Sequence, residues 1–277
     1  MLCLTIIIIY TVVAITAGII YSDWSKECDY NNRNQPPSAK YLMGTDKFGH
    51  SVVSKTFLGA KVSLTVGFVA NIIAIPLGLL LGAIAGFFGG FIDDIIVWFY
   101  TTLASIPGLI RVIAIKFAFE GIVFFKGTWM EVDMSGMTGI CVALAITGWI
   151  NTCRYVRAEV MKVRELDYVT AAHAIGTPNF TILGRHILPN IMHIGIITFS
   201  LGFVGAVTAE VALSYLNLGV TNMPSWGRMI AEAQADIIVG RWWQLVAASG
   251  AMFILVLALN IFGDRLRDAL DPKLRNL

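Results

Sequence analysis

Charged residues are scarce in this sequence. Asp, Glu, Lys and Arg make up only 14% of its 277 residues, and apolar residues make up 57%, whereas soluble domains carry about 25% charged residues. The net charge of +2 combines both signs in nearly equal number, so it indicates neither a nucleic-acid partner nor an acidic ligand. The shortage of charge excludes an ordinary soluble domain, and we expect an all-α protein embedded in a lipid bilayer.

Cysteine and histidine are also few, and several catalytic patterns are missing. The sequence contains neither the phosphate-binding pattern G-x-x-x-x-G-K-S/T nor the zinc-protease pattern H-E-x-x-H. We therefore expect unpaired cysteines, no metal site, no catalytic residue, no cofactor in this chain and no ATP hydrolysis by this chain alone. The residues without metal-type spacing are Cys3, Cys28, Cys141, Cys153, His50, His173, His186 and His193.

Long apolar runs are abundant. A bilayer core about 30 Å thick needs about 20 apolar residues in a helix. The run that begins the sequence has no basic residues before it and no clear cleavage site, so we expect a membrane helix there rather than a signal peptide. We predict one transmembrane domain over residues 1–277 with about six helices. The candidate spans are residues 2–21, 62–92, 95–110, 137–156, 190–209 and 242–262.

Polar segments separate these spans and bear on orientation. With six spans, residues 22–61 and 214–241 lie on one side of the membrane and residues 154–189 on the other. The number of basic residues on each side does not decide the orientation, but their density next to span ends favours a cytoplasmic 154–189 segment and two cytoplasmic termini. The basic residues next to span ends are Arg154, Arg157, Lys162, Arg164, Arg265 and Arg267.

The 154–189 segment has its own helical pattern. Residues 159–175 contain no Pro or Gly and are followed by Gly176 and Pro178, which is typical of a helix that ends at a C′ glycine. A second short helix is expected over 179–187, before Pro189. Connections between bundled helices usually run about 2–8 residues, so the length of this segment predicts a docking element.

Several motifs resemble one known family. The letters YVTAAHAIG at 168–176, followed by HILPN at 186–190, resemble the EAA loop of ABC importer permeases. Further motifs resemble the C-type permeases of dipeptide and oligopeptide importers, and the resemblance runs from about residue 44 to the C-terminus. These motifs are GTD at 44–46, GAKVSL at 59–64, LSYLNLG at 213–219, PSWG at 224–227, GDRLRD at 263–268 and LDP at 270–272.

This resemblance implies a type I importer permease fold in a bacterial inner membrane. It also implies a second, B-type permease, two cytoplasmic ATPase subunits that bind ATP and Mg²⁺, and an external substrate-binding protein that delivers a peptide or similar solute. The loop at 165–189 would dock in a groove of an ATPase, with small residues permitting close approach and Tyr168 and Ile175 as possible anchors. The implied coupling residues are Tyr168, Thr170, Ala171, Ala172, Ile175, Gly176, Leu188 and Pro189.

Arg111 and Glu210 fall within or beside predicted spans, where a charge costs at least about 2.5–3.5 kcal/mol. They either face a translocation path, or snorkel or form an interhelical pair near the outer interface. An alternative class of protein, a proton- or ion-coupled secondary carrier, would use these two charges and would need neither an ATPase nor a docking loop.

Small and polar residues within the spans predict how the helices pack. Pro76 and Pro107 are expected to kink their helices, and Asn71 and Asn260 to form interhelical hydrogen bonds. Glycines about four residues apart predict a small face for close helix packing. These are Gly78, Gly82, Gly86, Gly89 and Gly90.

Overall fold

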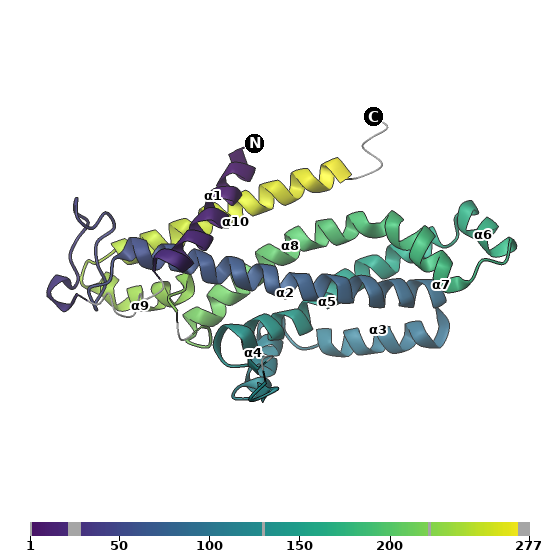
Figure 1. Ribbon diagram of the computed structural model, residues 1–277, viewed down its shortest axis with the longest axis horizontal. Helices are drawn as coiled ribbons and strands as arrows, with labels where there is room; N and C mark the ends of the chain where they lie inside the picture. Colours follow the sequence, from purple (N-terminus) through teal and green to yellow (C-terminus); the bar gives the residue numbers. More distant parts are fainter. Residues whose placement is uncertain (1, 22–28, 129–130, 221–222, 271–277) are drawn as a thin grey trace.

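The computed structural model describes residues 2–21, 29–128, 131–220 and 223–270, and most of its helices follow one long axis (Figure 1). Cys28 and the 271–272 part of the last motif lie outside these residues. Among the described helices, five are long and apolar enough to cross a membrane: α1 Leu2–Ile20, α2 Val52–Phe88, α5 Gly136–Val163, α8 Leu188–Tyr215 and α10 Trp243–Leu270. The predicted all-α, multi-pass membrane protein is confirmed.

The predicted span over residues 95–110 is broken into two helices. α3 (Gly90–Ala104) and α4 (Gly108–Phe119) meet at an angle of 95°. Pro107 has an extended backbone immediately before α4, and a proline disfavours helical geometry in the residue before it. The expected kink at Pro107 is therefore a full break, whereas Pro76 lies inside a continuous α2.

α2 begins at Val52, ten residues before the predicted start of the second span at residue 62. The predicted span began later because Lys55 and Lys61 are charged and interrupt the apolar run in the sequence. Lys55 is buried and bound to two carboxylates, and the Lys61 side chain lies against Gly18 of α1. Both lysines fit in the helix, so the polar segment before α2 ends at Ser51.

A close helix contact joins α2 to α5 through glycine. A Cβ added at Gly78, Gly82 or Gly86 would lie 2.6–2.7 Å from a backbone carbonyl oxygen of α5. Such distances leave no room for a side chain, so the predicted small face is confirmed for these three residues. The oxygens they face belong to Trp149, Cys153 and Arg157, which repeat at the same interval of four residues.

Gly89 and Gly90 were predicted to belong to the packing face, but they form a turn instead. Both have positive φ, +65° and +53°, and they form the turn between α2 and α3. This backbone geometry is easy for glycine and unfavourable for other residues. The two glycines therefore reverse the chain rather than pack against a neighbouring helix.

The predicted interhelical hydrogen bonds of the two asparagines were wrong. The amide nitrogens of Asn71 and Asn260 each donate to a carbonyl oxygen four residues earlier in their own helix, at 2.7 and 3.0 Å. Asn71 nevertheless packs against Gly202 of α8.

Short elements connect the spans. The connection between α4 and α5 carries a two-stranded antiparallel ribbon, and the connection between α5 and α8 carries three short helical segments. These elements are η2 Tyr30–Asn32, β1 Val123–Phe124, β2 Val132–Asp133, α6 Asp167–Ala174, α7 Asn179–Thr181, the π-helical η3 Ile182–Ile187, and α9 Trp226–Ile238.

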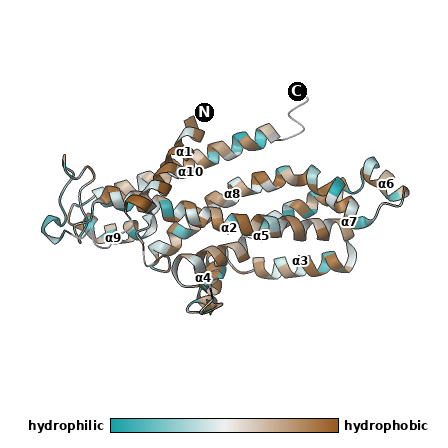
Figure 2. Ribbon diagram, in the orientation of Figure 1, coloured by the Kyte–Doolittle hydropathy of each residue, from teal (hydrophilic) through white to brown (hydrophobic). Residues whose placement is uncertain are grey.

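The two ends of the long axis differ in content. α6 lies at one end, and residues 29–51 lie at the other end, next to α9 (Figure 1). α1 runs toward the α9 end and α10 runs away from it. In Figure 2, α1 is hydrophobic along most of its length, while hydrophilic residues are frequent in the loops before α2. α1 therefore starts, and α10 therefore ends, in the direction of the α6 end, as expected when both termini lie on the same side as α6.

The glycine contact makes a testable prediction. Gly82→Val should destabilise the protein by about 1–3 kcal/mol, because the added carbons would force α2 away from α5. The control is Gly250→Val in α10, where a Cβ would meet no atom within 4 Å. Thermal unfolding in detergent should show a lower midpoint for Gly82→Val only; equal midpoints would contradict the proposed close contact.

Candidate coupling loop and translocation pathway

The docking segment is a short helix set apart from α5. α5 ends at Val163, and Leu166 has an extended backbone before α6 begins at Asp167. The single helix predicted over residues 159–175 is therefore two helices. Arg164 holds the turn between them, because its Nη1 donates to the carbonyl oxygen of Gly86 at 2.9 Å.

The predicted stop of this helix at Gly176 is confirmed. Gly176 has φ +79°, its N–H donates to His173 O at 3.0 Å, and the N–H of Thr177 donates to Ala172 O at 3.1 Å. These two bonds form a Schellman motif, which satisfies the last carbonyls of a helix. The end of α6 therefore has a defined shape.

One side of the loop is packed firmly onto the spans. Val169 and Ala172 of α6 and three residues of η3 lie buried in an apolar cluster with α2, α5 and α8. His173 stacks on Phe87 at the end of α2, with ring centroids 6.0 Å apart. The η3 residues in the cluster are Ile182, Leu183 and Ile187. Because so many apolar side chains hold it, the loop is attached as a unit to the ends of these helices.

The other side of the loop exposes apolar side chains. Ile175 is 83% exposed and Phe180 is 76% exposed, and Leu166 is also largely exposed. Exposed apolar groups together at a polar end of a protein mark an interaction site. Phe180 was missed in the sequence because the resemblance gave it no role, although an aromatic residue directly after Pro178 and Asn179 was a usable signal.

The eight predicted coupling residues differ in how far their side chains are exposed. Ala172 faces the chain's own core and Leu188 is half-buried, so these two contribute little outward surface. The hydroxyl of Tyr168 accepts a hydrogen bond from Asn190 at 2.9 Å, which links α6 to the start of α8. The exposed members are Tyr168, Thr170, Ala171, Ile175, Gly176 and Pro189.

A hollow of ≈ 320 Å³ lies among α2, α4, α5 and α8. Its wall contains one charged residue, Arg111, together with polar side chains from α2, α5 and α8. These are Asn71, Thr147, Asn151, Thr152, Tyr155 and Thr198. A mainly apolar hollow with a few polar groups inside a membrane protein is typical of a solute path.

A second hollow of ≈ 640 Å³ continues from the first toward the other end of α5. The two share Tyr155, Thr198 and Leu201 in their walls. The second hollow also reaches Lys162 in the last turn of α5 and Arg267 near the end of α10. The two hollows therefore form one route that leads toward the end where α6 lies.

Glu210 does not line either hollow. It is fully buried in α8 and accepts hydrogen bonds from the hydroxyls of Ser63 at 2.8 Å and Ser214 at 2.7 Å. Arg111 instead donates from Nη1 to the carbonyl oxygens of Leu103 and Ile106. Among the described residues the two charges thus have neutral partners, which does not match the interhelical pair considered from the sequence. Arg111 lies on the route and Glu210 lies apart from it.

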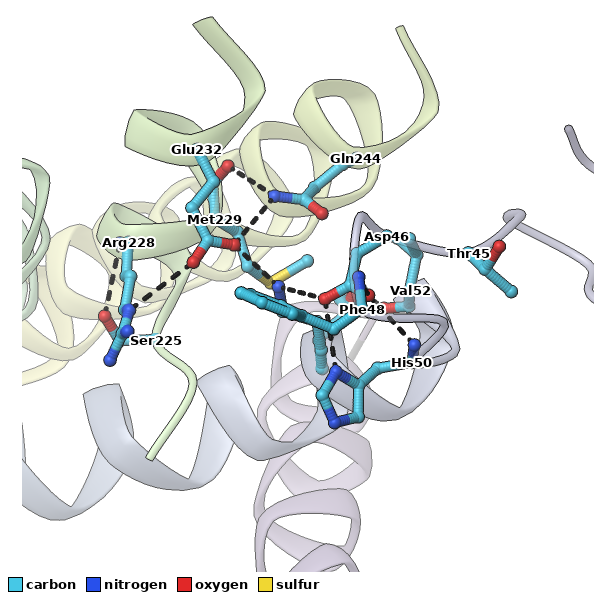
Figure 3. A network of polar contacts seen from close by, with 12 residues as sticks. Thr45, Asp46, Phe48, His50, Val52, Ser225, Arg228, Met229, Glu232 and Gln244 are labelled. Atoms are coloured by element: carbon cyan, nitrogen blue, oxygen red, sulfur yellow. Dashed lines mark hydrogen bonds and ion pairs between the residues drawn. The ribbon is translucent and has the colours of Figure 1, made fainter. Parts of the chain in front are cut away.

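A buried ion network closes the opposite end of the molecule (Figure 3). Nζ of Lys55, at the start of α2, lies 2.9 Å from Asp46 Oδ2 and 2.8 Å from Glu232 Oε2. Gln244 of α10 donates to Glu232, and Trp243 donates to the carbonyl oxygen of Thr45 at 3.0 Å. The network therefore ties the segment before α2 to α2, α9 and α10.

The carboxylates of this network are held in their charged form. Burial alone would raise the pKa of Asp46 and of Glu232. The ammonium group of Lys55 opposes burial at both, Lys47 and Arg228 add to its effect at Glu232, and both pKa values lie below their ordinary range. Backbone N–H groups of Phe48 and His50 also donate to Asp46 and lower its pKa. A lowered carboxyl pKa stabilises the fold at neutral pH, and this stabilisation is lost as the pH falls through the folded-state pKa.

The other titratable side chains show no further site in the described part of the chain. Cys3, Cys141 and Cys153 are unpaired. Within the residues that the structure covers, no three His, Cys, Asp or Glu side chains lie close enough together to hold a metal ion.

A bundle of membrane-spanning helices that encloses a polar route and carries an apolar docking loop at one end is the architecture of a transport permease. Residues 78–276 match the family model described as binding-protein-dependent transport system inner membrane component. The chain belongs to this family. This membership makes it a permease subunit of an ATP-driven importer and goes against the secondary carrier.

Three characterised relatives cover most of the chain. It is 36% identical over 244 residues to the dipeptide transport system permease protein DppC of Bacillus subtilis, covering 88% of this chain and 72% of that protein. It is 33% identical over 270 residues to the oligopeptide transport system permease protein OppC of the same organism, covering 95% and 84%. It is 33% identical over 249 residues to the glutathione transport system permease protein GsiD of Pectobacterium atrosepticum, covering 90% and 78%.

The ion network generates the second prediction. Lys55→Met should cost about 3–5 kcal/mol at pH 7, because it leaves two buried carboxylates without a counter-ion. The deficit should shrink as the pH approaches about 4, where carboxyl groups begin to take up protons and lose their charge. Thermal midpoints between pH 4 and pH 8 measure this. Lys61→Met is the control, since no carboxylate partner of Lys61 is seen in the described residues; an equal, pH-independent loss in both variants would contradict the network's role.

Proposed function

We propose that this chain forms, with a second permease subunit, the membrane path for peptides or similar small solutes. The observation that carries the proposal is the α6 loop, which is packed rigidly on the ends of α2, α5 and α8 and exposes Ile175 and Phe180. The printed names of the three relatives support the solute class, because they refer to dipeptides, oligopeptides and glutathione.

The loop at 165–189 couples an ATPase to this path. The apolar cluster joins α6 and η3 to α2, α5 and α8, and the same three helices line the polar hollow. A displacement of α6 by a docked ATPase would therefore move the walls of the route. Coupling requires that each nucleotide state of the ATPase favour one arrangement of the helices, because a partner indifferent to both shifts nothing.

ATP and Mg²⁺ are bound by two separate cytoplasmic ATPase subunits, and this chain holds no cofactor of its own. The absence of a Gly-rich phosphate-binding pattern from the sequence supports this division of labour. An external substrate-binding protein delivers the solute at the end formed by residues 29–51 and α9. This arrangement places α6 and both termini in the cytoplasm of a bacterium.

The docking role predicts a selective loss of the ATPases. Ile175→Glu should weaken their binding by about 2 kcal/mol or more, a factor of about thirty, because it places a charge on the most exposed apolar residue of the loop. The measurement is the amount of ATPase that co-purifies with the tagged chain from native membranes in mild detergent.

Ile238→Glu is the matched control, since Ile238 is 86% exposed at the opposite end, in α9. It should keep the full amount of ATPase. If Ile175→Glu retains the ATPases, or if the unaltered chain purifies alone and transports without ATP, the coupling proposal is wrong.

The orientation is tested by labelling single cysteines in intact cells, in a chain whose four native cysteines are replaced by serine, because Cys28 precedes α2 and would otherwise react in every variant. Ala39→Cys, in the segment before α2, should react with a membrane-impermeant maleimide added outside. Asn179→Cys, exposed at the start of α7, should react only after the membrane is permeabilised. The cysteine-free chain gives the background, and the reverse pattern would place α6 outside the cell.

A further inference from the structure

We propose that the hollow around Arg111 binds the carboxylate group of the solute during its passage. This inference deepens the proposed function and rests on it, since peptides carry a free C-terminal carboxylate. The hollow's ≈ 320 Å³ lies at the lower end of the range for small-molecule sites, about 300–1,000 Å³.

The guanidinium of Arg111 has one edge in use and one edge open. Nη1 makes both of the hydrogen bonds that the side chain forms with described residues, to Leu103 O at 2.7 Å and Ile106 O at 3.5 Å. Nε is buried and has no hydrogen-bond partner in the described part of the chain. The edge formed by Nε and Nη2 is therefore free to donate two parallel hydrogen bonds, which is the geometry that a carboxylate accepts from arginine.

The bonds to Leu103 and Ile106 also fix the position of the side chain. They come from the last turn of α3 and the break before α4, so the guanidinium is held across the bend between these helices. A fixed guanidinium loses less conformational freedom when a ligand binds. The break at Pro107 thus supplies the anchor for the proposed site.

The charge of the hollow favours an anion. Arg111 is its one charged wall residue, and the wall includes no Asp or Glu. Arg154 lies close enough to add to the positive potential, with its guanidinium 4.9 Å from the ring centre of Tyr100. In a membrane interior, where water screens little, this excess positive charge attracts a carboxylate and repels a cation.

The remaining wall suits the neutral part of a peptide. Asn151 of α5 offers an amide group that can donate to a peptide C=O or accept from a peptide N–H. The hydroxyls of Thr147 and Thr198 donate to carbonyls of their own helices, so they can accept from peptide N–H groups. The route continues past Tyr155 into the second hollow, where Lys162 is already paired with Glu159 at 2.8 Å. The second hollow thus carries an acidic residue as well as Lys162 and Arg267, whereas the first hollow carries Arg111 with no acidic residue, so the carboxylate is held at the first hollow before release.

The test measures charge preference at a cysteine placed in the hollow. Asn151→Cys is introduced into the complete transporter in lipid nanodiscs, and its reaction rates with an anionic sulfonatoethyl and a cationic trimethylammonioethyl methanethiosulfonate are compared. The anionic reagent should react faster relative to a free thiol in solution. Arg111→Gln should reduce this preference by about tenfold, because the nearby positive charge is removed.

Ala158→Cys is the matched control in the second hollow. It lies seven residues along α5 from Asn151, about 10 Å away, and its rate ratio should change much less with Arg111→Gln. A ratio at residue 151 that does not depend on Arg111 would overturn the site, as would a cysteine at 151 that reacts with neither reagent in any nucleotide state.

Protection by a peptide identifies the ligand group. Trialanine should slow labelling of Asn151→Cys, and trialanine amide, which lacks the carboxylate, should not; Arg111→Gln should abolish the difference. Equal protection by both peptides, or by neither, overturns the carboxylate assignment. Failure of the proposed function is distinguished by ATP-dependent peptide uptake into proteoliposomes that contain the same transporter: uptake without charge preference refutes only the site, and charge preference without uptake refutes the peptide importer.

Discussion

The close approach of α2 to α5 is the contact on which the other functional features depend. Lipid provides no hydrophobic drive for helices to associate, so they rely on van der Waals contact between small residues. Gly78, Gly82 and Gly86 provide this contact against backbone carbonyls of α5. The paired helices then supply walls of the polar hollow along their length and hold α6 at their shared end. The polar hollow and the α6 loop are therefore both built on the same two tightly packed helices, α2 and α5.

The two ends of this pair are secured by different forces. At the α6 end, apolar side chains such as Val169 and Ile187 fill a common cluster, and such packing resists local deformation. At the α9 end, Lys55 holds Asp46 and Glu232 by charge, which makes that end sensitive to protonation. Under the proposed coupling role, movement imposed at α6 would be transmitted along helices whose far ends are fastened to the segment before α2.

The sequence predicted the features that depend on local composition. The glycine interval from Gly78 to Gly86, the helix stop at Gly176 and most of the apolar runs were correct, although the run over 95–110 is broken into two helices. The start of α2 could not be predicted from the sequence alone. Lys55 is acceptable in a buried helix only because Glu232, far along the chain, lies beside it. The inward side of Ala172 also depends on the distant cluster that covers it. Long-range packing, rather than local propensity, decided these cases.

Arg111 and Glu210 show how the same cost of burial leads to two different roles. Glu210 has its oxygens occupied by serine hydroxyls from its own helix and from α2, so the structure satisfies it fully without a ligand. Arg111 is satisfied on one edge only and faces a hollow with no acidic wall residue. An unsatisfied buried donor costs about 1–3 kcal/mol, and a passing carboxylate removes that cost while it is bound. Because the donors form only one side of the hollow, such binding stays weak enough for release, as a transport site requires.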